Sequence, residues 1–136
     1  MNPKAFIVPC SGIGKAYGSV ARESAFCVTE DLRPETSRIM PLSLLVLGEE
    51  ETREALARTP VIAVDGCKLS CAAKVAAEMG GEVRHALQVL DTFRRHPEWK
   101  PEGISELNEA GHQLARALGE EVALLVDEIK DEVKNG

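Results

Sequence analysis

Two short apolar runs, each followed by a cysteine-bearing turn, most constrain how this chain can fold. The first run covers residues 5–8 and leads into Cys10-Ser11-Gly12-Ile13-Gly14-Lys15. The second covers residues 61–64 and leads into Asp65-Gly66-Cys67-Lys68-Leu69-Ser70-Cys71. A continuous apolar run before a turn is typical of a strand buried on both faces. Such strands belong to parallel sheets that helices cover on both sides.

Helical and strand patterns alternate along the rest of the first 103 residues. They predict helices over residues 15–28, 49–58 and 68–79, strands over 38–40 and 85–90, and a polar loop over 91–103. Pro41 cannot donate to a central ladder, so the second strand ends before it. Residues 44–47 fit a strand or a helical turn, because periodicity does not separate the two. Gly80 and Gly81 predict a C-terminal cap for the helix before them.

The last part of the chain, residues 104–133, predicts one long helix or two nearly collinear ones. Its apolar stripe has an eleven-residue repeat and comprises Leu107, Gly111, Leu114, Leu118, Val122, Leu125, Ile129 and Val133. This repeat is close to the natural helix period, so the stripe stays on one face and is expected to cover the sheet. Gly119 lies off the stripe, where it costs only about 1 kcal/mol relative to alanine. The overhanging end of the helix leaves room for a homodimer contact.

The alternation of strands and helices predicts an α/β fold in one domain, residues 1–136. We expect a three-layer, doubly wound sheet of about four parallel strands with right-handed crossovers. The order 2-1-3-4 is the flavodoxin-like, Rossmann-like arrangement, in which strands 1 and 3 are neighbours. Ligands bind at the carboxyl ends of these two strands. This topology places Cys10 beside Cys67 at the crevice, with Cys71 one turn further on.

Composition excludes several classes of partner. The net charge of −6 argues against a nucleic-acid backbone or an anionic membrane surface, and 4% aromatic residues argue against a base-stacking platform. No apolar run approaches the roughly 20 residues that a membrane helix needs, and the N-terminus lacks a signal-peptide apolar region. We therefore expect a cytoplasmic protein, in which four cysteines indicate metal binding or thiol chemistry rather than disulfides.

The cysteines at the two strand ends suit a metal ion. If Cys67 and Cys71 lie on a regular helix, their Cβ atoms are about 5–6 Å apart, which is too wide for a disulfide but acceptable for shared zinc ligation. A helix N-terminus and the neighbouring lysines also favour thiolates at Cys10 and Cys67. Cys27 lies about 18 Å along a straight helix from the crevice, so we expect a buried core residue there. If that helix is short or bent, Cys27 becomes a further ligand.

The first turn also has the features of a small-anion site. Ser11, Gly12 and Gly14 precede a helix whose backbone N–H groups could bind an anion. The turn lacks the residues of a Walker loop, a dinucleotide fingerprint or a Cys-x5-Arg phosphatase loop. His96 is expected on the crevice side, whereas His85 and His112 are expected at the surface. Asp65 and Asp91 are expected as turn or capping residues.

Three of these segments together resemble the DGC-domain family, named after the sequence Asp65-Gly66-Cys67. They are Cys10-Ser11-Gly12 after the first strand, the segment from Val61 to Cys71, and Lys74 with Gly80 in the next helix. The resemblance implies a zinc-binding protein, because the family is described as zinc-binding on account of four cysteines with chelating potential. Its biochemical role is not established.

The resemblance carries over three cysteines as zinc ligands, Cys10, Cys67 and Cys71. In many relatives the fourth cysteine follows the second strand, where this chain has Met40-Pro41. Three thiolates completed by water, aspartate or histidine make an open site, as in catalytic zinc proteins.

These observations leave three functions open, and they do not decide whether the protein is an enzyme. The first is zinc binding, with an iron–sulfur cluster as a variant. The second is a thiol redox or sulfur-transfer enzyme in which Cys10 is the nucleophile and Cys67 or Cys71 resolves. The third is an interaction module that works through the acidic C-terminal helix.

Overall fold

The computed structural model of the chain describes residues 3–10, 16–66, 69–103 and 106–135, the side chains of 133–135 excepted. Four parallel strands form a sheet in the order β2-β1-β3-β4. They are β1 (Ala5–Pro9), β2 (Ser37–Ile39), β3 (Val61–Asp65) and β4 (Val83–Gln88). The predicted α/β class and strand order are therefore confirmed.

The two central strands are buried along their whole length, as their apolar runs predict. In the register between them Phe6 lies opposite Val61 and Pro9 opposite Val64. The strands therefore end side by side, and the backbone N–H of Cys10 donates to the carbonyl oxygen of Val64 at 2.9 Å. This pairing fixes where the first cysteine leaves the sheet.

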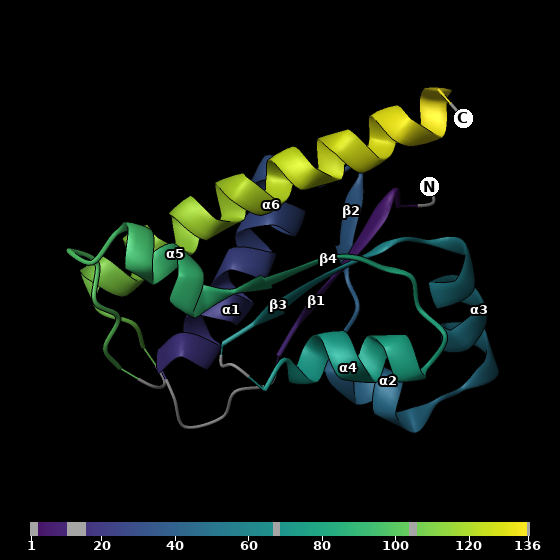
Figure 1. Ribbon diagram of the computed structural model, residues 1–136, viewed down its shortest axis with the longest axis horizontal. Helices are drawn as coiled ribbons and strands as arrows, with labels where there is room; N and C mark the ends of the chain where they lie inside the picture. The colour runs from purple at the N-terminus through teal and green to yellow at the C-terminus, as the bar shows by residue number, and fades with distance from the viewer. Residues whose placement is uncertain (1–2, 11–15, 67–68, 104–105, 136) are drawn as a thin grey trace.

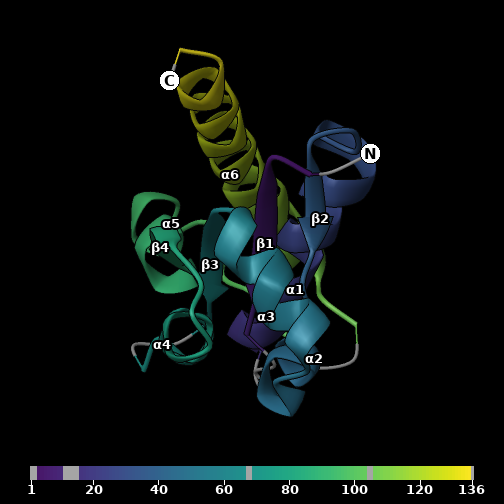
Figure 2. The same cartoon turned by 90° about the vertical axis from the view of Figure 1, so that its right-hand side faces the viewer.

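Helices cover both faces of the sheet, as Figures 1 and 2 show. One face carries α1 (Ala16–Phe26), its π-helical continuation η1 (Cys27–Leu32), α5 (Val89–Arg95) and α6 (Glu109–Asn135). The other carries α2 (Leu42–Leu47), α3 (Glu50–Arg58) and α4 (Cys71–Glu78). Within the described ranges, none of these helices has the length and apolar character needed to cross a membrane.

Several predicted element boundaries were wrong. The fourth strand covers residues 83–88 rather than 85–90, and the predicted polar loop begins with a helix, α5, whose Val89 and Thr92 are buried. The undecided segment is the helix α2. The helix after β3 begins at Cys71 rather than at residue 68.

The long C-terminal helix is a single helix of 27 residues. In Figures 1 and 2 the C-terminal part of this helix extends past the amino ends of the strands, away from the crevice. Most of the predicted stripe is buried, including Leu114, Leu118, Val122 and Ile129, but Leu125 is half-buried and Val126 replaces it inside. Gly119, which lies off the predicted stripe, is also buried.

Candidate functional site

Cys10 lies at the carboxyl end of β1 and is almost fully buried, with 5% of its surface exposed. Its sulfur accepts a hydrogen bond from the backbone N–H of Gly66 at 3.0 Å. A hydrogen bond donated to sulfur favours the thiolate, which is the form that binds metal and acts as a nucleophile. The predicted meeting of the two strand-end turns is therefore present at Cys10 and Gly66. Cys67, the next residue, lies outside the described residues, as do Ser11, Gly12 and Gly14.

Asp65 connects the end of β3 to the beginning of α4. Its side chain is 1% exposed, and its two carboxylate oxygens accept the backbone N–H groups of Ala72 at 2.7 Å and Ala73 at 3.3 Å. Burial raises the pKa of this carboxyl, while the two N–H bonds and the charge of Lys74 lower it less strongly. Asp65 is thus a capping residue, which is one of its two expected roles.

Gly66 allows the same turn to approach α1. A Cβ atom at this position would lie 2.8 Å from the backbone nitrogen of Gly18 and 2.9 Å from the carbonyl carbon of Tyr17. Both contacts are with backbone atoms, so any larger residue would push the turn away from α1. The Asp65-Gly66 pair therefore has a structural explanation on both sides: Asp65 holds α4, and Gly66 packs on α1.

Cys71 is the first residue of α4 and is exposed. Ser70, the residue before it, has a left-handed backbone conformation with a φ of 53°. The Ser70 hydroxyl accepts a hydrogen bond from the side-chain amide of Gln88 at 3.0 Å. Since α4 begins at Cys71, the predicted helix does not include Cys67. The i,i+4 argument that favoured metal over a disulfide for this pair therefore no longer applies.

Cys27 does not lie on the buried side of α1 as expected. It is half-buried at the start of η1, and its sulfur lies 3.7 Å from the guanidinium nitrogen Nη1 of Arg116 on α6. A Cβ atom on Gly119 would lie 3.3 Å from this sulfur. Burial raises the pKa of the Cys27 thiol, and the charge of Arg116 lowers it less strongly. A guanidinium beside the sulfur also opposes a bound metal cation, so Cys27 is a poor ligand.

The contacts described for His96 and His112 are with residues other than cysteines. The ring of His96 stacks on Trp99 with centroids 4.6 Å apart, after α5 rather than in a loop leaving the sheet. His85 lies within β4, not at its start. His112 is exposed, as expected, but it also binds Glu23 of α1 through distances of 2.7 and 2.8 Å. This hydrogen bond raises the pKa of His112, and the charges of Glu23, Glu109 and Glu106 raise it further.

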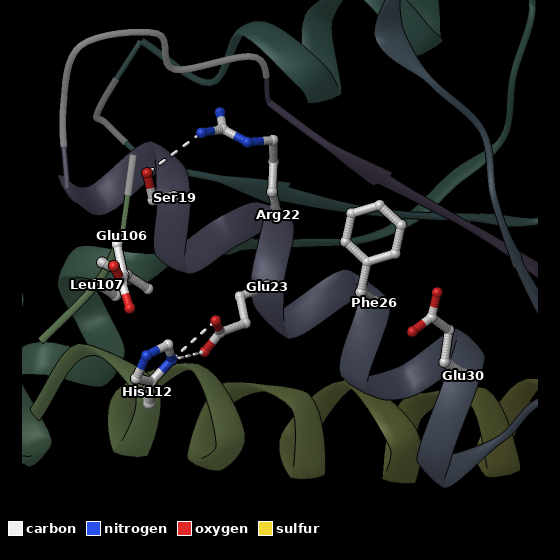
Figure 3. Close-up of a pocket in the computed structure, with 8 residues that line it drawn as sticks. All are labelled: Ser19, Arg22, Glu23, Phe26, Glu30, Glu106, Leu107 and His112. Carbon is white, nitrogen blue, oxygen red and sulfur yellow. Dashed lines mark hydrogen bonds and ion pairs between the residues drawn. The ribbon is translucent and has the colours of Figure 1, made fainter. Parts of the chain in front are cut away.

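A cavity of about 620 Å³ lies between α1 and the beginning of α6 (Figure 3). It is lined by Ser19, Arg22, Glu23, Phe26, Glu30, Glu106, Leu107 and His112. Glu23 and His112 point toward one another, whereas Arg22 and Phe26 extend from another side of α1. Sequence reasoning missed Arg22 and Phe26, although their i,i+4 spacing places both on one helix face, apart from the buried Val20 and Ser24.

The described residues include two of the three predicted zinc ligands, Cys10 and Cys71. Within the part of the chain that the structure describes, no three His, Cys, Asp or Glu side chains are grouped to hold a metal ion, and the predicted trio includes Cys67, outside that part. Cys10 and Cys71 flank the Asp65-Gly66 turn, because Gly66 binds the Cys10 sulfur and Asp65 binds the residues next to Cys71. Asp65 itself is engaged at α4, so it does not supply the fourth ligand.

The fold and this turn define an α/β protein with cysteines at the carboxyl ends of two central strands. A family model described as the DGC domain matches residues 6–111. The chain belongs to the DGC-domain family, which the Cys10 and Asp65-Gly66-Cys67 segments had indicated. No curated protein and no solved structure matches the chain.

Proposed function

We propose that this protein is a cytoplasmic zinc-binding protein that holds the ion at the carboxyl ends of β1 and β3. Cys10, Cys67 and Cys71 are the proposed ligands. The observation that carries the proposal is the hydrogen bond from Gly66 to the Cys10 sulfur, because it brings the first cysteine turn against the residue that precedes Cys67. Zinc is bound by thiolates, and this bond favours the thiolate form.

The geometry around the turn also supports an open site. Asp65 is occupied by two backbone N–H groups, and the described histidine contacts lie elsewhere. Three cysteine ligands then leave the fourth position to water or a substrate, as in zinc sites where the metal polarises a bound oxygen. When bound, the ion would supply Lewis-acid chemistry. The chain's own part is to keep the Cys10 sulfur buried and oriented.

Metal analysis of protein purified without chelator or affinity tag tests the proposal. We expect about one zinc ion per chain, lost when Cys10, Cys67 or Cys71 is changed to serine. Cys27→Ser is the matched control and should keep the metal, because Cys27 packs against α6. Substoichiometric zinc that a Cys67→Ser variant leaves unchanged would contradict the proposal. Iron with visible absorbance would indicate the iron–sulfur variant instead.

The second candidate function is thiol chemistry at the same cysteines. Here the Cys10 thiolate would attack one sulfur of a disulfide substrate, expel the other as a thiolate, and form a mixed disulfide that Cys67 or Cys71 resolves. The hydrogen bond from Gly66 also supports thiol chemistry, since it stabilises the attacking thiolate. The exposure of Cys71 suits a resolving residue.

The pH dependence of alkylation, read residue by residue, separates this candidate from a structural role. We expect the Cys10 thiol, whose sulfur accepts the Gly66 N–H, to be alkylated at lower pH than Cys27 in metal-stripped protein, because burial raises the pKa of the Cys27 thiol. If Cys10 is alkylated no more readily than Cys27 at any pH, the thiol-enzyme candidate has no support.

A further inference from the structure

A second cavity, of about 330 Å³, opens beside Cys10 at the carboxyl ends of β1 and β2. It is lined by Pro9, Cys10, Arg22, Phe26, Ile39, Pro41, Leu42 and Ser43. These residues come from the ends of two neighbouring strands, one side of α1, and the beginning of α2. The cavity thus lies at the carboxyl edge of the sheet, where open α/β sheets bind ligands, next to the switch point between β1 and β3.

The size of the cavity limits what it can hold. Small-molecule sites usually have volumes of about 300–1,000 Å³, and this one lies at the lower end. A dinucleotide is too large for it, whereas a compact organic molecule fits. The cavity lies on the β2 side of Cys10, whereas Cys71 begins the helix that follows β3 on the other side.

The walls are chiefly apolar. Phe26, Ile39, Leu42 and the two prolines supply hydrocarbon surface, and Phe26 is 49% exposed. Covering an exposed aromatic ring with apolar ligand atoms is favourable, by roughly 25 cal/mol for each Å² removed from water. The walls therefore favour a ligand with an apolar body.

Among the described residues that line the cavity, Arg22 carries the charge. Its guanidinium donates to the hydroxyl of Ser19 at 3.2 Å, and a guanidinium has five N–H donors in a planar fork. That fork matches the two oxygens of a carboxylate. In Figure 3 Arg22 and Phe26 extend from one side of α1, whereas the Glu23 carboxylate points toward His112.

We propose that this cavity binds a small organic carboxylate, with the carboxylate at Arg22 and the apolar body against Phe26 and Leu42. The ligand would then lie beside the Cys10 sulfur, which lines the same cavity. This inference goes beyond metal binding and does not depend on it, because Arg22, Phe26 and Leu42 are not proposed zinc ligands.

Titration of the isotope-labelled full chain, stripped of metal, tests the inference by NMR. The probes are benzoate, its neutral counterpart benzyl alcohol, and inorganic phosphate. We expect benzoate to shift the amide signals of Phe26, Ile39 and Leu42, and to bind more tightly than either other probe. Arg22→Gln should weaken benzoate binding by about tenfold or more, since a charge-assisted hydrogen bond is lost.

Two controls separate the outcomes. Arg53→Gln, on the opposite face of the sheet, should leave benzoate binding unchanged, and Phe26→Ser should weaken benzoate and benzyl alcohol alike. Equal binding of benzoate by Arg22→Gln and the unmodified protein would overturn the inference, as would tighter binding of phosphate. Because the protein carries no metal in this experiment, a failure to bind zinc leaves the result unaffected.

Discussion

Asp65 shows how one buried side chain can organise the turn that follows a strand. It accepts hydrogen bonds from Ala72 and Ala73, seven and eight residues ahead, and so determines where α4 begins. Two opposing effects act on the pKa of this carboxyl. Burial disfavours its charge and raises its pKa, whereas the two N–H groups it holds favour the charge. Burial is the stronger effect.

Two substitutions of Asp65 should therefore lower the free energy of unfolding by different amounts. Asp65→Ala leaves two backbone N–H groups without their acceptor and should cost about 1–3 kcal/mol in the free energy of unfolding. Asp65→Asn keeps one acceptor oxygen and should cost less. Urea unfolding followed by circular dichroism measures both. An alanine variant as stable as the asparagine variant would contradict the capping role.

The raised pKa of Asp65 also predicts how stability depends on pH. The folded state holds the proton more tightly than the unfolded state, so the favourable contribution is present below the ordinary aspartate pKa and is lost as pH rises through the folded pKa. The stability of the unmodified protein relative to Asp65→Asn should thus fall as pH rises above the ordinary aspartate pKa of about 4. A difference that grows with pH would show that the carboxylate is stabilised by folding.

At the scale of whole elements, the contact between η1 and α6 depends on a glycine. Gly119 lies against Cys27 and Ser24, where a Cβ atom would be 3.3 Å from the Cys27 sulfur and 3.3 Å from the Ser24 carbonyl oxygen. Alanine is favoured over glycine inside a helix by about 1 kcal/mol. Glycine at this position therefore lowers the helix propensity of α6 but allows η1 and α6 to approach closely. The π-helical turn begins at Cys27, and such turns are frequent at functional sites.

A double-mutant cycle between Gly119 and Cys27 tests whether the close contact of these two residues affects stability. Gly119→Ala alone should be neutral or destabilising, because crowding against the sulfur offsets the gain in helix propensity. In a Cys27→Ala background the sulfur is gone, and the same change should be more favourable by about 0.5–1 kcal/mol. Gly111→Ala is the matched control, because its close contacts are with Asn108 and Leu107 of its own segment. Additive effects of Gly119→Ala and Cys27→Ala would contradict the contact.

For the whole molecule, apolar packing matters more than the ion pairs along α6. Arg33 pairs with Asp127 at 2.7 Å and lowers the pKa of that carboxyl through a hydrogen bond. Arg84–Glu132 and Arg95–Glu121 join β4 and α5 to the same helix. All three pairs are substantially exposed, and such pairs contribute about 0–1 kcal/mol each. A fully buried leucine contributes several times more.

The consequence is a large difference between two leucines of α6. Leu118 is 0% exposed and Leu124 is 63% exposed. Leu118→Ala should lower the free energy of unfolding by about 2–5 kcal/mol, whereas Leu124→Ala should change it by less than about 0.5 kcal/mol. Denaturant unfolding followed by Trp99 fluorescence and by circular dichroism gives both values. Similar losses for the two variants would mean that the opposite face of α6 is also packed.

The sequence by itself determined the central strands, their order and the cysteines at their ends. Residues 5–8 and 61–64 are continuous apolar runs, and the handedness of parallel crossovers leaves few ways to connect them. Only the tertiary structure decided that α4 begins at Cys71, that Cys27 faces Arg116, and that Gly66 donates to the Cys10 sulfur. Each of these depends on atoms far apart in the sequence, which local periodicity does not relate. The strand pattern is a property of neighbouring residues, whereas the cysteine environment is a property of the folded contacts.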